Sequence, residues 1–259
     1  MDQRVYLDGA PGGPWMGHAL DEVGCIWRAS KQSEAITKAP QAISRFFLWL
    51  AAHDEPQPSG PKPGQAVSQA AVAPGDIRAE VVEIEEVPGF GKSGSAVGFF
   101  GPDLEPVTDE DIARAIRRLG YARKDLLGLV AGLPAETLDQ SPPARKRTIR
   151  KNLSHVAQCH AFYLSRVLGD DRTREALPGS WPKDTLSLLD WTMSRSMEAL
   201  ANLPAELREG VFRAAEPAED WTARKMLRRF VEHEVEHVEV VRSTLKFLRE
   251  TTRAEAVAP

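Results

Sequence analysis

The spacing of hydrophobic residues changes between the two halves of the chain. In the first half, short runs at residues 4–7, 15–20 and 24–29 alternate weakly between apolar and polar positions, and a Gly-Pro cluster at residues 11–14 separates the first two. This pattern predicts short β-strands, with the first two joined as a hairpin. A further alternating run at residues 78–87 predicts another strand.

One helix is predicted within this first half. Ser33 is expected to cap it together with Glu34, and apolar residues at helical spacing extend it to about residue 53. Pro40 is expected to interrupt this helix. Residues 56–74 hold five prolines among Ser, Gly, Gln and Ala, a composition typical of a solvated, semi-rigid connector.

The second half has a helical period throughout. Thr108 and Asp111 form a capping box, and Asp220 is expected to cap the last helix. Apolar stripes at helical spacing predict four helices, at residues 109–134, 148–168, 185–203 and 222–249.

We therefore expect an α+β chain in two domains. Residues 1–104 form a small α/β module that includes the connector and the extra strand. Residues 105–259 form an all-α, up-down four-helix bundle, because four long helices without competing strands are typical of that fold.

Composition excludes several classes of protein. Hydrophobic residues make up 42% of the chain and charged residues 27%, which is typical of a globular protein. The net charge of −4 disfavours binding to nucleic acid or to an anionic membrane. The first residues have no signal-peptide pattern, and Cys25 and Cys159 are too few and too far apart for a disulfide scaffold. We expect a cytoplasmic protein with neither nucleic acid nor membrane as a partner.

Three of the six histidines have the arrangement that a metal site needs. His233 and His237 are about 40° apart around a helix and fall on its apolar stripe. His155 falls on the apolar side of the helix at 148–168, whereas His160 lies about 140° away from it. Buried imidazoles need partners for their nitrogens, and a divalent cation satisfies several at once.

Two other interpretations remain open for these residues. His233 and His237 could be exposed among glutamates, with His155 a hydrogen-bonded core residue. The string from 233 to 237 also fits the HExxH pattern of zinc peptidases, in which Glu234 would be the general base. Such a peptidase needs a third ligand downstream, and the available candidate is Glu255 in an Ala-rich tail.

Two segments carry a resemblance to a known family. Residues 147–155 read Arg-Thr-Ile-Arg-Lys-Asn-Leu-Ser-His, and residues 221–237 begin Trp-Thr-Ala-Arg-Lys-Met-Leu and end His-Glu-Val-Glu-His. Residues 106–250 thereby resemble the DinB/YfiT-like superfamily of bacterial proteins. The resemblance implies a four-helix bundle in which three histidines hold one divalent metal. These are His155, His233 and His237.

A second resemblance covers residues 3–53. Gly24-Cys25 and Glu34-Ala35 are similar to the segment that joins the third strand to the helix in HicB-like antitoxins. No DNA-binding appendage accompanies this module, so the resemblance does not imply repression. Short strands leave edges that can pair, which favours a homodimer.

The DinB/YfiT-like resemblance implies a metal-dependent hydrolase or a thiol-dependent transferase. Three imidazoles with a vacant fourth position are the arrangement of catalytic zinc. Zinc is the expected metal, with nickel, iron and manganese as alternatives because imidazole binds each of them. Glu234 or Glu236 is the expected catalytic proton acceptor, and the expected substrate is a small molecule such as a low-molecular-weight thiol. The alternative is a non-enzymatic binding protein that keeps metal for stability.

Three further features have two interpretations each. Residues 89–93 superficially suggest a phosphate loop but lack its first glycine, so we expect a turn. The five cations within residues 145–151 form either a solvated face or a clamp for an anion. Cys159, one turn beyond His155, is either packed in the core or takes part in the site as a ligand or redox group.

Overall fold

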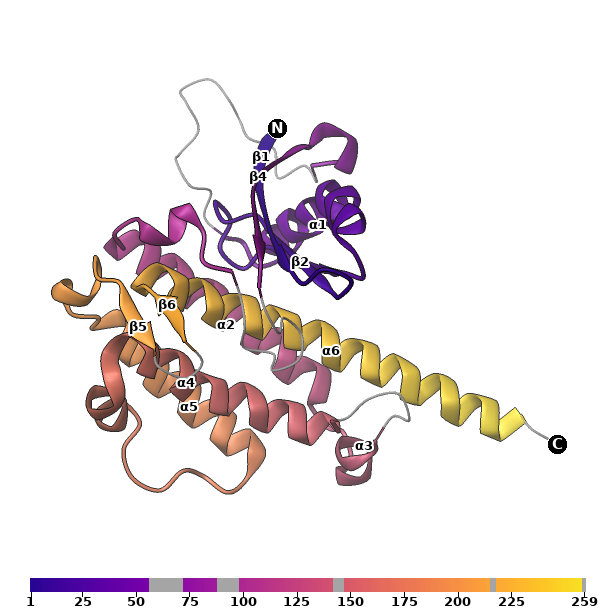
Figure 1. Cartoon of the computed structure of the whole chain (residues 1–259). Coiled ribbons are helices and arrows are strands. Elements are labelled where there is room, and N and C mark those ends of the chain that lie inside the picture. The colour runs from indigo at the N-terminus through magenta and orange to yellow at the C-terminus, as the bar shows by residue number, and fades with distance from the viewer. Residues whose placement is uncertain (56–71, 88–97, 142–146, 215–217, 258–259) are drawn as a thin grey trace. The chain divides into compact units, whose positions relative to one another are not determined.

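The computed structural model describes residues 1–55, 72–87, 98–141, 147–214 and 218–257. Most of the expected connector, the glycine-rich segment at 89–93, and Arg145 and Lys146 lie outside these ranges. The fold is α+β, with a small sheet in the N-terminal part and a helical region after it (Figure 1). The chain divides into two compact units, Met1–Pro102 and Asp103–Pro259.

The four runs with alternating polarity in the first unit all form strands of one sheet. The sheet has the order β3-β2-β1-β4, in which β1 pairs antiparallel with β2 and parallel with β4. The strands are β1 (Asp2–Gly9), β2 (Trp15–His18), β3 (Ile26–Ala29) and β4 (Arg78–Glu86). A short 3-10 helix, η1 (Pro74–Asp76), precedes β4, and another, η2 (Gly101–Leu104), follows it.

The helix of the first unit, α1 (Gln32–Ala52), differs from the prediction at two points. It continues through Pro40, which was expected to interrupt it. Proline has no amide hydrogen to donate to the carbonyl of Ile36, and Ile36, which is 41% exposed, lies on the exposed side of the helix. Its N-cap residue is Lys31 rather than Ser33, and the Glu34 carboxylate accepts the Ser30 amide at 2.7 Å.

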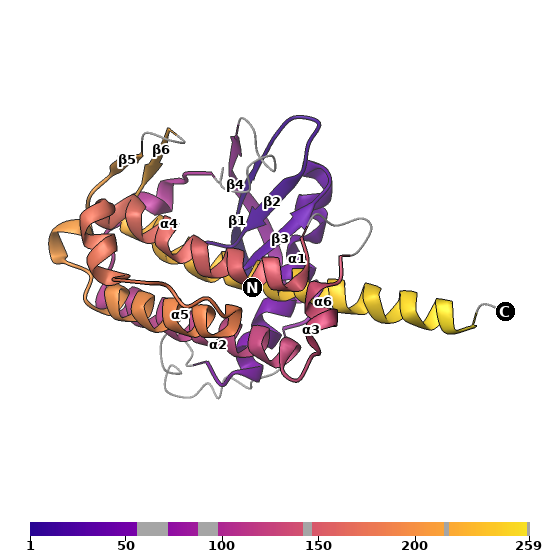
Figure 2. The same ribbon diagram turned by 90° about the horizontal axis from the view of Figure 1, so that it is seen from below.

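The second unit consists mainly of four long helices. In the contacts between them, α2 packs against α5 and α6, and α4 packs against the same two helices (Figures 1 and 2). The bounds are α2 (Asp109–Val130), α4 (Ile149–Ala176), α5 (Thr185–Ala201) and α6 (Ala223–Val257). All four correspond to predicted helices. None of the described helices has the length and apolar character needed to cross a membrane.

The sequence pattern missed the short elements of this unit. They are α3 (Ala135–Asp139), the 3-10 helix η3 (Ala205–Leu207), and a hairpin of β5 (Phe212–Ala214) and β6 (Glu219–Trp221). The pattern also ended the second long helix at residue 168. Gly169, with φ of 78°, kinks the chain there, and the helix resumes as far as Ala176.

In the second unit, one predicted helix cap is confirmed and one is wrong. The Thr108 hydroxyl accepts the Asp111 amide at 3.1 Å, and the Asp111 carboxylate accepts the Thr108 amide at 3.0 Å, which is a capping box. At α6 the capping residue is Thr222, whose hydroxyl accepts the Lys225 amide at 3.1 Å. Asp220 belongs to β6 instead, where it forms an ion pair with Arg213 at 2.8 Å.

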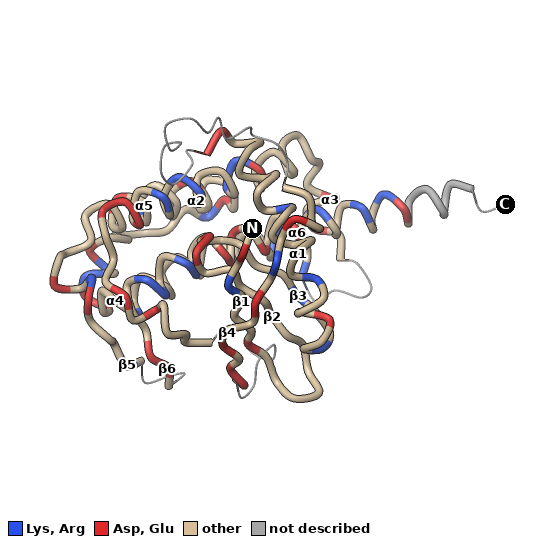
Figure 3. The backbone as a smooth tube through the Cα atoms, turned by 90° about the horizontal axis from the view of Figure 1, so that it is seen from above, with Lys and Arg blue, Asp and Glu red and all other residues tan. Residues whose placement is uncertain are grey.

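The start of the second unit is tied to α6 by buried polar contacts. Asp103, 1% exposed, accepts two hydrogen bonds from Arg228, at 2.8 and 2.9 Å. The Thr222 hydroxyl donates to the Asp103 carbonyl, and Arg224 donates to the carbonyls of residues 105 and 106. Charges of both signs are interspersed along the long helices (Figure 3).

These contacts predict where the second unit can be separated from the first. We expect a fragment of residues 103–259 to be helical and to unfold cooperatively by circular dichroism. A fragment of residues 107–259 loses Asp103 and leaves the buried Arg228 with less compensation, so its free energy of unfolding should be lower by about 3–5 kcal/mol. Equal stability of the two fragments, or aggregation of the longer one, would contradict this division of the chain.

Candidate metal centre

Three histidines from two helices lie side by side in the second unit. The Nε2 atoms of His155 on α4 and His233 on α6 are 3.3 Å apart. The ring of His237 has its centre 4.4 Å from that of His233 and 5.2 Å from that of His155. The structure therefore brings together all three of the predicted ligands.

The facing helices explain why these side chains meet. Residues four apart on a helix lie on one face, so His233 and His237 extend from α6 in the same direction. Both are buried, at 5% and 6% exposure, and α4 packs along this face and presents the half-buried His155.

Cys159 belongs to the same cluster. It follows His155 by one helical turn, and its Sγ atom lies 3.6 Å from both ring nitrogens of His155. The candidate ligand atoms of His155, Cys159 and His233 all lie within 4.8 Å of one another. The ring of His237 stands beside this group of three.

The distances between these atoms fit a tetrahedral cation. With Zn–N bonds of about 2.0–2.1 Å, two nitrogen ligands at the tetrahedral angle are about 3.3 Å apart. With a Zn–S bond of about 2.3 Å, a nitrogen and a sulfur ligand are about 3.5 Å apart. The observed separation of 3.3 Å between Nε2 of His155 and Nε2 of His233 matches the first value, whereas Sγ of Cys159 lies at 3.6 Å from both nitrogens of His155 and would have to rotate to share a cation with Nε2. The residues present therefore fit a divalent metal.

The electrostatic environment keeps the imidazoles neutral. Burial, reinforced by the neighbouring His237, lowers the pKa of His155 to about 4. Burial and the same neighbour hold the pKa of His233 well below its ordinary value of 6.5. Both rings are thus deprotonated at neutral pH, which is the form that binds metal. Burial also raises the pKa of the Cys159 thiol to about 11, so the thiol is neutral when no cation lies beside it.

Glu234, a predicted proton acceptor, is placed in a different cluster. Its carboxylate accepts hydrogen bonds from Arg123 on α2 at 2.5 and 3.2 Å and lies 3.7 Å from His160 on α4. Burial opposes its negative charge, but Arg123 and His160 outweigh burial and hold the pKa of Glu234 at about 2. A carboxylate engaged in this way is a poor proton acceptor, so the structure argues against that role.

His160 completes this second cluster. Its Nδ1 lies 2.9 Å from the hydroxyl of Ser196 on α5, and Arg123 also donates to the carbonyl of Leu189 on α5. Side chains of all four long helices therefore meet in one buried polar network. The helical angle correctly separated His160 from His155, but no local pattern indicates that His160, Glu234 and Arg123 belong together.

The negative charge of Glu236 influences pKa values within the histidine cluster. Glu236 is half-buried, and its negative charge raises the pKa of His155, opposing the effect of burial. The same charge also raises the pKa values of Cys159 and Tyr163, the next residues on the same side of α4. Glu236 is thus the carboxylate of the predicted pair whose field reaches the site, and its catalytic role stays a prediction.

An aromatic wall borders the site, and sequence reasoning did not assign it a role. The buried ring of Tyr163 lies 5.6 Å from that of His233 and 5.4 Å from that of Phe230. Arg229 lies over Tyr163 at 5.8 Å and forms an ion pair with Glu232 at 2.7 Å. Helical spacing from His155 placed Tyr163 on the apolar side of α4, which is the one signal that points to it.

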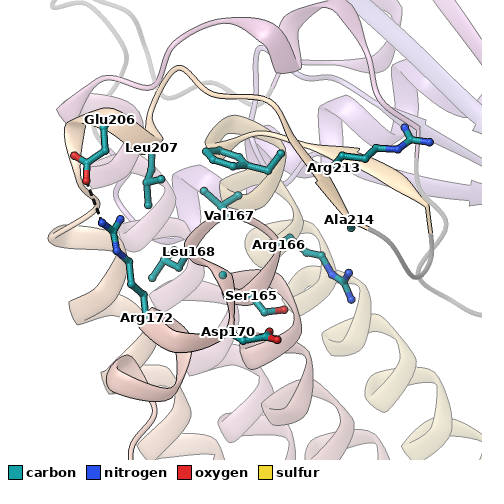
Figure 4. Close-up of a pocket in the computed structure, with 12 residues that line it drawn as sticks. Ser165, Arg166, Val167, Leu168, Asp170, Arg172, Glu206, Leu207, Arg213 and Ala214 are labelled. Atoms are coloured by element: carbon teal, nitrogen blue, oxygen red, sulfur yellow. Dashed lines mark hydrogen bonds and ion pairs between the residues drawn. The ribbon is translucent and has the colours of Figure 1, made fainter.

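A cavity of about 740 Å³ lies elsewhere in this unit. It surrounds the kink at Gly169 and is closed on one side by η3 and β5 (Figure 4). Arg172 and Glu206, two of its lining residues, form an ion pair at 3.3 Å. Ser165 is the lining residue of α4 that comes first in the sequence after His155. It lies about 15 Å along the helix from His155, given a rise of about 1.5 Å per residue. The cavity is therefore separate from the histidine cluster.

Comparison with known proteins gives one match. Residues 118–241 match the family model of the DinB superfamily, whose members bind metal. The matched segment includes His155, Cys159, His233 and His237. Searches among curated proteins and among solved structures found no match. The family match does not reach the first unit, so the resemblance of that unit to HicB remains a prediction.

The lowered pKa of His155 predicts how the metal-free protein responds to acid. The unfolded chain protonates His155 below pH 6.5, its ordinary pKa, while the folded protein does so only below about 4. The unfolded state therefore binds more protons between these values, and the free energy of unfolding should fall as the pH drops from 6.5 toward 4.

Denaturant titrations on chelator-treated protein measure this slope. His155→Gln removes one titrating group, so its slope between pH 6.5 and 4 should be shallower. Loss of the Glu234 charge adds its own destabilisation from about pH 4.5 downward, but it does so in both proteins, so the difference between the two slopes belongs to His155. Identical slopes for the wild type and the variant would show that the environment of His155 in the folded protein is not as described.

Proposed function

We propose that this chain is a metal-dependent enzyme whose second unit is a four-helix bundle built around one divalent cation. His155, His233 and His237 are its ligands. The observation that carries this proposal is the close approach of the neutral imidazoles between α4 and α6, with Nε2 of His155 and Nε2 of His233 at 3.3 Å. Zinc is the first choice of metal, and nickel, iron and manganese also accept imidazole.

The reaction is a hydrolysis or a transfer that uses a small thiol. A divalent cation in such a site polarises a substrate oxygen or stabilises a substrate thiol in its ionised form. Glu236 would take up the proton, because Glu234 is held by Arg123. The wall formed by Tyr163 and Phe230 keeps the buried side of the site apolar, which strengthens electrostatic interactions with the substrate.

The first unit, in this proposal, mediates assembly. β4 is the last strand of its described sheet, and the side chains of Val82 and Ile84 on this strand are 45% and 48% exposed. Apolar side chains on an edge strand favour pairing with a second copy of the chain. A cytoplasmic homodimer with a HicB-like assembly module, and without nucleic acid or membrane partners, fits these features.

A second candidate function follows from the position of Cys159. A thiolate beside three imidazoles gives four protein ligands, which is the arrangement of structural zinc sites. The chain would then be a binding protein in which the metal stabilises the helices. Turnover separates the two candidates: the enzyme loses activity toward thiol conjugates or esters when treated with chelator and regains it with zinc, whereas the binding protein shows no metal-dependent turnover.

Metal analysis tests the centre that both candidates share. His233→Ala removes the most buried ligand and should reduce bound metal from about one equivalent to near zero by elemental analysis. His53→Ala, the same substitution in the first unit, should retain the wild-type metal content. Full metal retention in His233→Ala would refute the assignment.

A further inference from the structure

Two pairs of side chains face each other across the α4–α6 contact. On α6 the pair is His233 and His237, and on α4 it is His155 and Cys159, with a spacing of four residues in each case. Since residues four apart share a helix face, each helix offers two donor atoms toward the other. The described structure thus holds three nitrogen donors and one sulfur donor in one place.

The sulfur lies within reach of the imidazoles without being placed as a hydrogen-bonding thiol would be. A thiol that simply donates a hydrogen bond to an imidazole lies along the lone pair of one nitrogen. Sγ of Cys159 is instead equally distant, at 3.6 Å, from Nδ1 and Nε2 of His155, so it is aligned with neither. Two ligands on one tetrahedral cation would place Sγ about 3.5 Å from Nε2 and about 5 Å from Nδ1, so a rotation of the His155 ring or of the Cys159 side chain brings both onto one cation.

We infer that Cys159 is the fourth protein ligand of the metal, completing a set of three imidazoles and one thiolate with His155, His233 and His237. This inference rests on the proposed metal centre and adds a soft donor to it. Thiolate favours zinc, iron or copper(I) over harder cations such as manganese. A closed set of four ligands also means that a substrate reaches the metal only by displacing Cys159.

Displacement is sterically simple on this helix. Cys159 is only partly buried, and His155 lies on the turn before it. A change of its χ1 rotamer moves the sulfur away from the cluster without moving α4. The thiolate can therefore act as an exchangeable ligand in an enzyme or as a permanent one in a binding protein.

Cobalt(II) replaces zinc and reports on sulfur ligation through a thiolate charge-transfer band in the near ultraviolet. We expect the full-length protein to bind one cobalt(II) with this band and to lose the band in Cys159→Ser. Affinity should also fall at least about tenfold, since even outer partners of a ligand contribute about 10–100-fold. Cys25→Ala, which alters the other cysteine, should keep both band and affinity.

A second measurement does not depend on the folding of Cys159→Ser. In the Cys25→Ala protein Cys159 is the one remaining cysteine, and zinc should slow its reaction with a disulfide reagent. Cobalt bound with an identical spectrum in Cys159→Ser, or an unprotected thiol in zinc-loaded Cys25→Ala, would overturn the role of Cys159. Failure of the wild type to bind cobalt would instead refute the proposed metal centre itself.

Discussion

The structure of the second unit depends on holding three imidazoles, two of them buried and one half-buried, between two helices. Transfer of neutral imidazole nitrogens out of water is unfavourable unless each finds a partner. His155 and His233 face each other at 3.3 Å, and burial keeps both deprotonated. One cation that binds all three rings removes this cost, and its binding energy becomes part of the free energy of folding. Metal and fold are therefore coupled in this account.

Buried ion pairs place α6 where the centre needs it. Glu234 is paired with Arg123 of α2, and Arg228 with Asp103 at the start of the unit. Each pair lies within five residues of His233 on α6. Burial of such groups is tolerated only with well-aligned partners, so the pairs restrict the rotation and translation of the helix. A change at Arg123 is therefore expected to affect the metal centre from the adjacent face of α6.

Periodicity predicted the long elements and the three histidines because each depends on one helix or strand at a time. It placed His155, His233 and His237 on apolar faces, and the capping box at Thr108 marked the start of α2. Periodicity failed where contacts between residues on different elements determine the role of a residue. Asp220 pairs with Arg213 in a hairpin rather than capping α6. The ion pair that removes Glu234 from the site joins residues 111 positions apart, which no local pattern reveals.

X-ray absorption spectroscopy on the zinc-loaded protein tests the central claim most directly, because it counts the atoms around the metal by element. The account predicts one zinc per chain with three nitrogens at about 2.0–2.1 Å, one sulfur at about 2.3 Å, and the outer-shell scattering of imidazole rings. A first shell of oxygen atoms without imidazole scattering would contradict the claim that α4 and α6 meet to hold a metal.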